Sequence, residues 1–170
     1  VVRNRFLPAS KQHKKIAIIG MSCKLPESDS LQEYWNNLQS AKDLISEIPK
    51  DRWDASTYYS TESAPDKTYT NKGGFVKNAA LFDSLYFKIT DEDALCMDPQ
   101  QRIILELTRE LLAHAGYEKE ELAGTQTGVY IGAKDNNYVR NNYHLLPTSA
   151  YQHTVVNTIS NMIAARVSDF

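Results

Sequence analysis

Cysteine is scarce in this chain, whose 170 residues contain only two, Cys23 and Cys96. They are too far apart in the sequence to form the framework of a disulfide-stabilised fold. Unpaired cysteines are typical of proteins kept in a reducing compartment, which predicts a cytoplasmic protein. Histidine and cysteine also do not recur at the spacings of structural zinc sites, so no metal site is expected.

Long apolar runs and an excess of positive charge are also lacking. No stretch of about 18 consecutive apolar residues occurs, which argues against a membrane span. The net charge is −2, so nothing marks a nucleic-acid-binding surface. The glycine pattern G-x-G-x-x-G is absent, which leaves no support for a dinucleotide-binding fold.

No side chain stands out as a catalytic group. Neither Cys23 nor Cys96 has a histidine nearby in the sequence to act as its base, so both are interpreted as small buried apolar groups. The acidic run Asp91–Asp93 falls in the first turn of an expected helix, where the helix dipole favours carboxylates. The residue pattern alone therefore predicts neither a catalytic residue nor a metal ligand.

The apolar pattern predicts an α/β fold. Short apolar runs at 16–19 and 129–131 predict neighbouring strands of one mixed sheet, buried on both faces. Helices are expected to pack against this sheet. Their predicted ranges are 30–41, 91–96, 98–115 and 151–166. Residues 42–90 are irregular, and the basic segment 1–14 is interpreted as a linker from an upstream domain, or else as a disordered tail.

Local signals mark where these helices begin and end. Ser30 and Glu33 have the spacing of a capping box, and Thr90 is the expected cap of the 91–96 helix. Asp98 is the expected cap of the longest helix, with Gln101 returning the capping bond, and Gly116 is the expected terminator.

Six segments resemble, in order and spacing, the β-ketoacyl synthase (ketosynthase) domain of modular polyketide synthases. They extend from Lys15 to Phe170, and MDPQQRIILELTRELLAHAGY is the most specific of them. The others are IAIIGMSCKLP, LQEYWNNLQSAKDLISEIPKDRWD, GGFVKNAALFDSLYFKIT, TGVYIGA and NTISNMIAARVSDF.

This resemblance implies a partial thiolase-like fold. Residues 15–170 would form the N-terminal portion of the domain, most of the first of its two similar α/β halves. In the family, the nucleophilic cysteine and two catalytic histidines follow the segment that resembles NTISNMIAARVSDF. The resemblance therefore assigns no catalytic residue here, and the 170-residue chain alone is expected to be inactive.

The reaction implied by the resemblance is a decarboxylative condensation. An acyl group passes from the phosphopantetheine arm of an acyl carrier protein to the cysteine, and a malonyl-type unit then extends it. No directly bound cofactor is implied. Expected partners are the carrier protein, the remaining half of the ketosynthase, a second copy in a homodimer, and an upstream synthase domain. The alternative is a non-catalytic ketosynthase remnant that serves as a docking module.

Two departures from the family pattern suggest a substrate-binding site. The segment after the second predicted strand carries charged and amide side chains where related domains have apolar and aromatic ones, and it approaches the acyl substrate in the family. The second departure lies in the last helix. The resulting candidates are Ala133, Lys134, Asp135, Asn136, Tyr138, Thr158 and Asn161. A solvated loop is the alternative interpretation of the segment from 133 to 138.

Overall fold

The structure is a computed structural model that describes residues 15–134 and 137–170. The expected linker at 1–14 and the candidate site residues Asp135 and Asn136 lie outside the described residues.

Helices make up most of the regular structure. The α-helices are α1 (Leu31–Gln39), α2 (Ala55–Tyr58), α3 (Asp91–Cys96), α4 (Pro99–Ala115), α5 (Lys119–Leu122), α6 (Tyr138–Asn142), α7 (Thr154–Thr158) and α8 (Met162–Asp169). The 3-10 helices are η1 (Tyr143–Leu145) and η2 (Thr148–His153). Strands β1 (Ser46–Glu47) and β2 (Lys72–Gly73) pair antiparallel, with Ser46 opposite Gly73.

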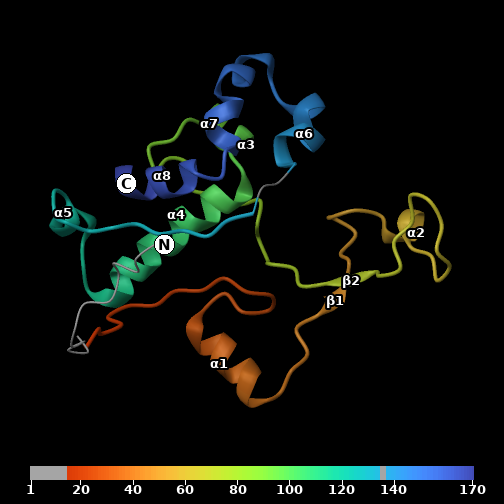
Figure 1. Cartoon of the computed structure of the whole chain (residues 1–170), viewed down its shortest axis with the longest axis horizontal. Coiled ribbons are helices and arrows are strands. Elements are labelled where there is room, and N and C mark those ends of the chain that lie inside the picture. The colour runs from red at the N-terminus through yellow and green to blue at the C-terminus, as the bar shows by residue number, and fades with distance from the viewer. Residues whose placement is uncertain (1–14, 135–136) are drawn as a thin grey trace, which may run out of the picture.

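The long helix α4 is the axis around which the other elements are arranged (Figure 1). α8 packs alongside it, and α3 and α7 lie near its N-terminal end. The buried apolar side chains come from these elements, from η2 and from the α3–α4 junction; they are Cys96, Met97, Leu105, Ala150 and Ile163. The core therefore lies mainly on one side of α4, at its N-terminal half.

Both ends of α4 form as the sequence predicts. The Asp98 carboxylate accepts a hydrogen bond from the Gln100 amide at 2.7 Å, and Pro99 occupies the first turn. Gly116 ends the helix with a φ of 76°, a left-handed conformation that glycine adopts without steric cost. Gln101 does not return the capping bond as predicted, because its side chain instead contacts the connection between α7 and α8.

The caps of α1 and α3 are also confirmed. Ser30 accepts from the Glu33 amide at 3.2 Å, and the Glu33 carboxylate accepts from the amide of Asp29 at 2.7 Å. The reciprocal bond thus reaches one residue further back than a standard capping box. Thr90 caps α3 by accepting from the Asp93 amide.

The two predicted buried strands do not form within the described residues. Ile16 and Ile18 are 91% and 80% exposed, and Tyr130 is 95% exposed. The only sheet in this part of the chain is the two-residue pair of β1 and β2. An apolar run indicates a tendency to be buried, but it becomes a strand only where a second backbone supplies hydrogen-bond partners. The described residues supply none to these two runs.

The predicted helix over 151–166 is broken into η2, α7 and α8. The chain turns at Ile159, whose φ and ψ of −70° and 127° are extended rather than helical. Thr158 donates its hydroxyl hydrogen back to the carbonyl of Thr154 at 2.7 Å, a contact that competes with continued helix. The Gln101 side-chain amide donates to the carbonyls of Val156 and Ile159 and so fixes the turn.

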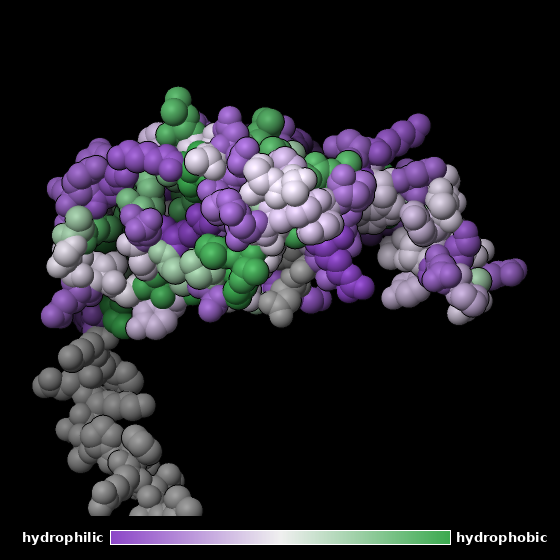
Figure 2. All heavy atoms as spheres, turned by 90° about the horizontal axis from the view of Figure 1, so that it is seen from above, coloured by the Kyte–Doolittle hydropathy of each residue, from purple (hydrophilic) through white to green (hydrophobic). Residues whose placement is uncertain are grey.

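Apolar side chains remain on the surface of the main body. Figure 2 shows them among polar side chains on the face seen from above, whereas the projecting end that carries α2 is mostly polar or neutral. The exposed apolar side chains include those of the run from Ile16 to Met21.

Candidate functional site

The first turn of α4 contacts both segments that carry the candidate site residues. On one side, the Gln100 side-chain amide donates to the Lys134 carbonyl at 2.9 Å. The same amide group lies 3.3 Å from the Asp98 carboxylate, which fixes its orientation. The loop that follows residue 131 is therefore tied to the N-terminus of α4 through backbone rather than through the Lys134 side chain.

Arg102 and Tyr138 extend this first contact. The Arg102 guanidinium lies 5.6 Å from the centroid of the Tyr138 ring, a cation–π arrangement, and one of its nitrogens donates to the Ala80 carbonyl at 3.3 Å. The Tyr138 hydroxyl donates to the Leu95 carbonyl at 3.1 Å. Arg102 is only 7% exposed, and its Nε has no hydrogen-bond partner within the described part of the chain.

The other side of the same turn contacts residues 156–161, the end of α7 and its connection to α8, which we call the elbow. The backbone amide of Asp98 donates to the Asn157 carbonyl at 2.9 Å. The Gln101 side-chain amide lies 3.3 Å from the Val156 carbonyl and 3.4 Å from the Ile159 carbonyl. Gln101 and Asn157 are each 1% exposed.

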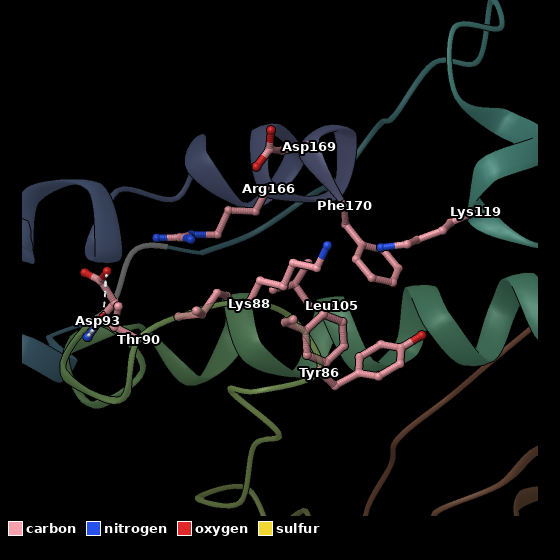
Figure 3. Close-up of a pocket in the computed structure, with 11 residues that line it drawn as sticks. Tyr86, Lys88, Thr90, Asp93, Leu105, Lys119, Arg166, Asp169 and Phe170 are labelled. Carbon is pink, nitrogen blue, oxygen red and sulfur yellow. Dashed lines mark hydrogen bonds between the residues drawn. The ribbon is translucent and has the colours of Figure 1, made fainter.

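Arg166 closes this polar cluster from α8. Its Nε donates to the Gln101 side-chain oxygen at 2.6 Å, and a terminal nitrogen donates to the Asn157 side-chain oxygen. The Asn157 amide in turn donates to the Asp93 carboxylate at 3.1 Å. Burial lowers the pKa of Arg166, and the charges of Asp93 and Asp169 oppose this shift. Figure 3 shows Arg166 extending from α8 toward the side of the pocket where Asp93 lies.

The structure brings the two groups of candidates to one helical turn but not into one cavity. Ala133 and Lys134 are exposed, and Tyr138 is half-buried at the start of α6. Thr158 is half-buried and Asn161 is exposed in the elbow. The cluster that joins these segments, Gln101 with Asn157 and Arg166, was not predicted from the sequence.

Two cavities are lined in part by α8. Of the candidates that the structure describes, Ala133, Lys134, Tyr138, Thr158 and Asn161, none lines them. One, of about 370 Å³, is bordered by Arg166, Asp93 and Leu105 together with charged and aromatic side chains. The other, of about 650 Å³, follows the apolar side of α4 at Ile104 and Leu107.

The cysteines are not placed for nucleophilic catalysis. Cys96 is fully buried, with its Sγ 3.7 Å from the Ala150 carbonyl oxygen. Burial raises the pKa of Cys96 and of Cys23, and nearby carboxylates, including Glu110 beside Cys23, raise both further. A thiol with a raised pKa carries little of the thiolate that acts as a nucleophile.

Metal and membrane sites find no support in the part of the chain that the structure describes. No group of three or more His, Cys, Asp or Glu side chains is arranged there to hold a metal ion. Among the helices of residues 15–134 and 137–170, none is long and apolar enough to cross a membrane.

Comparison with known protein families identifies the family of this chain. Residues 13–170 match the family described as "Beta-ketoacyl synthase, N-terminal domain". The chain belongs to the β-ketoacyl synthase family. The resemblance inferred from the sequence segments is thereby confirmed, and so is the expectation of a partial thiolase-like fold.

Curated relatives of this β-ketoacyl synthase segment include large polyketide synthases. It is 40% identical over 136 residues to the polyketide synthase PksL of Bacillus subtilis, covering 75% of this chain and 3% of the relative. It is 42% identical over 138 residues to the phthioceranic/hydroxyphthioceranic acid synthase of Mycobacterium tuberculosis, covering 80% of this chain and 6% of the relative. The segment thus spans a small part of these relatives.

Solved ketosynthase structures resemble the segment in fold. The oxazolomycin ketosynthase domain OzmH KS7 of Streptomyces albus is 33% identical, with a TM-score of 0.78, over 90% of this chain and 27% of that one. The ketosynthase from module 6 of the bacillaene synthase of Bacillus subtilis is 31% identical, with a TM-score of 0.73, over 91% and 24%.

The unpredicted residues of the β-ketoacyl synthase segment carried a weak signal in the sequence. Gln101 precedes the buried Leu105 by one helical turn, and Arg166 follows the buried Ile163 by three residues. Both polar side chains therefore occupy positions of an apolar stripe, where a buried polar group requires a partner. The pattern marks them as unusual, but it does not identify their partners.

Proposed function

We propose that the protein containing this segment is a ketosynthase that condenses acyl units in a modular polyketide synthase. An acyl group moves from a carrier-protein phosphopantetheine thiol to a cysteine thiol, forming a new thioester and releasing the arm. A malonyl-type unit on a carrier then loses CO₂, and its carbanion displaces the enzyme thiolate from the acyl group. The match of residues 13–170 to the family is the observation that carries this proposal.

The segment contributes structure rather than the reacting groups. Cys96 is buried, and the pKa of each cysteine is raised by burial, which supports a nucleophile other than Cys23 or Cys96. We infer that the 170 residues by themselves do not form the acyl-enzyme. A non-catalytic docking module remains the competing function for the segment, and the experiment below distinguishes the two.

We place the proposed substrate-binding region where the loop that follows residue 131 and the elbow both contact the first turn of α4. The loop contributes Ala133, Lys134 and Tyr138, and the elbow contributes Thr158 and Asn161. The candidates Asp135 and Asn136 lie outside the described residues. The shared anchorage of the loop and the elbow to Gln100, Gln101 and Asp98 supports this location, because one rigid turn sets the positions of both segments. No directly bound cofactor is needed, since the phosphopantetheine arm arrives with the carrier protein.

The partners we propose are the remainder of the ketosynthase, a second copy, an upstream synthase domain and an acyl carrier protein. Exposed Ile16, Ile18 and Tyr130 support the first of these, because such runs become buried strands once neighbouring backbone covers them. The solved relatives are about four times longer than the part matched here, since that part covers 27% and 24% of them. Free Cys23 and Cys96 support a reducing, cytoplasmic location.

Acylation followed by mass spectrometry tests the proposal. The full-length protein and the 170-residue chain are each incubated with the acetyl and hexanoyl thioesters of N-acetylcysteamine. The full-length protein is expected to gain one acyl group on a cysteine other than Cys23 or Cys96, and the short chain none. Absence of an adduct on the full-length protein would support the docking module, and an adduct on Cys23 or Cys96 would refute the assignment of roles.

A further inference from the structure

We propose that Gln101 and Arg166 are positioning residues that set the acyl-chain preference of the site by holding the elbow between α7 and α8. This inference rests on the proposed function, because it assigns a role to residues beside the proposed substrate-binding region. Neither residue contacts substrate in this scheme. Gln101 acts through backbone carbonyls of the elbow, and Arg166 acts through the side chains of Gln101 and Asn157.

Gln101 meets a requirement that few side chains can satisfy. Its amide nitrogen lies 3.3 and 3.4 Å from the carbonyls of Val156 and Ile159, while its amide oxygen accepts from Arg166 at 2.6 Å. It must therefore be donor and acceptor at once. A glutamate of the same length would accept from Arg166 through one oxygen but would place its other carboxylate oxygen against two carbonyl oxygens.

Arg166 holds the elbow through the side chain of Asn157. It donates to Gln101 through Nε and to Asn157 through a terminal nitrogen, and Asn157 continues the chain of bonds to Asp93. One planar guanidinium thus fixes α4 relative to α7, a geometry that a lysine ammonium cannot reproduce. Burying a guanidinium costs free energy, and well-packed apolar residues can often replace a buried polar cluster without loss of stability. Stability alone therefore does not account for this cluster.

The positions of Thr158 and Asn161 follow from this cluster. Thr158 lies between the two carbonyls that Gln101 holds, and Asn161 follows Ile159 by two residues at the start of α8. The elbow backbone is extended at Ile159. The Ile159 carbonyl also accepts from the Met162 amide at 3.1 Å, so Gln101 adds a second contact there and ties the same backbone to α4 through Val156. Releasing Gln101 or Arg166 therefore changes the positions of Thr158 and Asn161, and with them the proposed substrate-binding region.

The test compares two substrates on the full-length protein. Second-order acylation rates are measured with acetyl- and hexanoyl-N-acetylcysteamine for wild type, Gln101→Met, Gln101→Glu, Arg166→Met and Arg166→Lys. The ratio of hexanoyl to acetyl rates is expected to shift at least about fivefold in Gln101→Met and Arg166→Met, with Arg166→Lys between them and wild type. Gln32→Met, on the exposed α1, is the matched control and should leave the ratio within about twofold.

The rate ratio separates a positioning role from a structural one. A variant that only loses folded protein lowers both rates by the same factor and leaves the ratio unchanged. Equal losses for both thioesters in all four variants would overturn the inference while leaving the proposed function intact. If wild type is acylated by neither thioester, the proposed function fails, and this inference fails with it. Gln101→Glu, which keeps the contact with Arg166, tests the elbow contact even if Gln101→Met folds poorly.

Discussion

Gly20 packs against the C-terminal end of α4, and an alanine there should destabilise the protein. A Cβ atom at this position would lie 2.8 Å from the Cβ of Ala115. It would also lie 3.1 Å from the Leu111 carbonyl oxygen and 3.2 Å from a Leu111 methyl carbon. Carbon atoms pack best at about 3.5–4.0 Å, so the segment or the helix must shift.

The magnitude follows from what can move. The Ala115 Cβ and the Leu111 carbonyl belong to a regular helix, so neither yields without displacing α4. Overpacking of this kind costs about 1–3 kcal/mol. Replacing a glycine by alanine also lowers the entropy of the unfolded chain, which offsets about 0.4–1 kcal/mol of that cost. The expected net loss for Gly20→Ala is therefore about 1–2 kcal/mol in the free energy of unfolding.

Urea unfolding followed by circular dichroism measures this loss. Gly132→Ala is the matched control, because no atom lies within 4 Å of a Cβ built at Gly132. The control should change the free energy of unfolding by no more than about 0.5 kcal/mol in the destabilising direction. If Gly20→Ala and Gly132→Ala behave alike, the close approach of Gly20 to α4 is wrong.

A double-mutant cycle with Ala115→Gly identifies the contact itself. Removing the Ala115 Cβ takes away the atom nearest to the new methyl group, although it also costs about 1 kcal/mol of helix propensity. The double variant should therefore be less destabilised than the sum of the single variants, by about 0.5 kcal/mol or more. Additive effects would show that the cost of Gly20→Ala arises elsewhere.

Three further predictions concern a cap, the thiols and an ion pair. Asp98→Ala removes the oxygen that accepts from the Gln100 amide, so thermal unfolding should show a loss of about 1–2 kcal/mol. Burial raises the pKa of Cys23 and Cys96, so iodoacetamide should alkylate both more slowly than it alkylates free cysteine, and the rate should increase as pH rises. Cys96 should react last because it is fully buried, and rapid labelling of Cys96 at neutral pH would contradict that burial. A hydrogen bond from Lys77 lowers the pKa of Glu27. Any stabilisation of the folded protein by this pair is therefore fully present above the ordinary carboxyl pKa and is lost as the pH falls through the lowered pKa. Lys77→Gln should move the NMR-measured pKa of Glu27 back up, and an unchanged value would exclude the contact.

The family and the capped ends of α1, α3 and α4 could be predicted from the sequence because they depend on local or contiguous information. Caps act over three or four residues, so Ser30, Thr90 and Asp98 could be recognised without any knowledge of the fold. Gly116 likewise ends α4 because its left-handed conformation is a property of one residue. Short segments that occur in the family's order, such as the one containing MDPQQR, identified the family in the same way. The family match over residues 13–170 confirmed it.

The buried strands and the last helix were predicted wrongly because they depend on partners far away in the sequence. The run at 16–19 has the composition of a buried strand, but a strand also needs a neighbouring backbone to accept and donate hydrogen bonds. The 151–166 segment has helical periodicity, yet it breaks where Gln101, more than fifty residues earlier, binds the Val156 and Ile159 carbonyls.

The composition of the proposed site was decided by tertiary structure in the same way. The sequence drew attention to the loop at 133–138 and to Thr158 and Asn161, but not to what holds them in place. Gln101 and Arg166 are 65 residues apart in the sequence, and their side chains meet only because α8 packs along α4. Sequence alone thus determined where α1, α3 and α4 begin and which family this is. Tertiary structure decided which buried polar groups meet, because hydrogen bonds between distant residues depend on packing that no local pattern encodes.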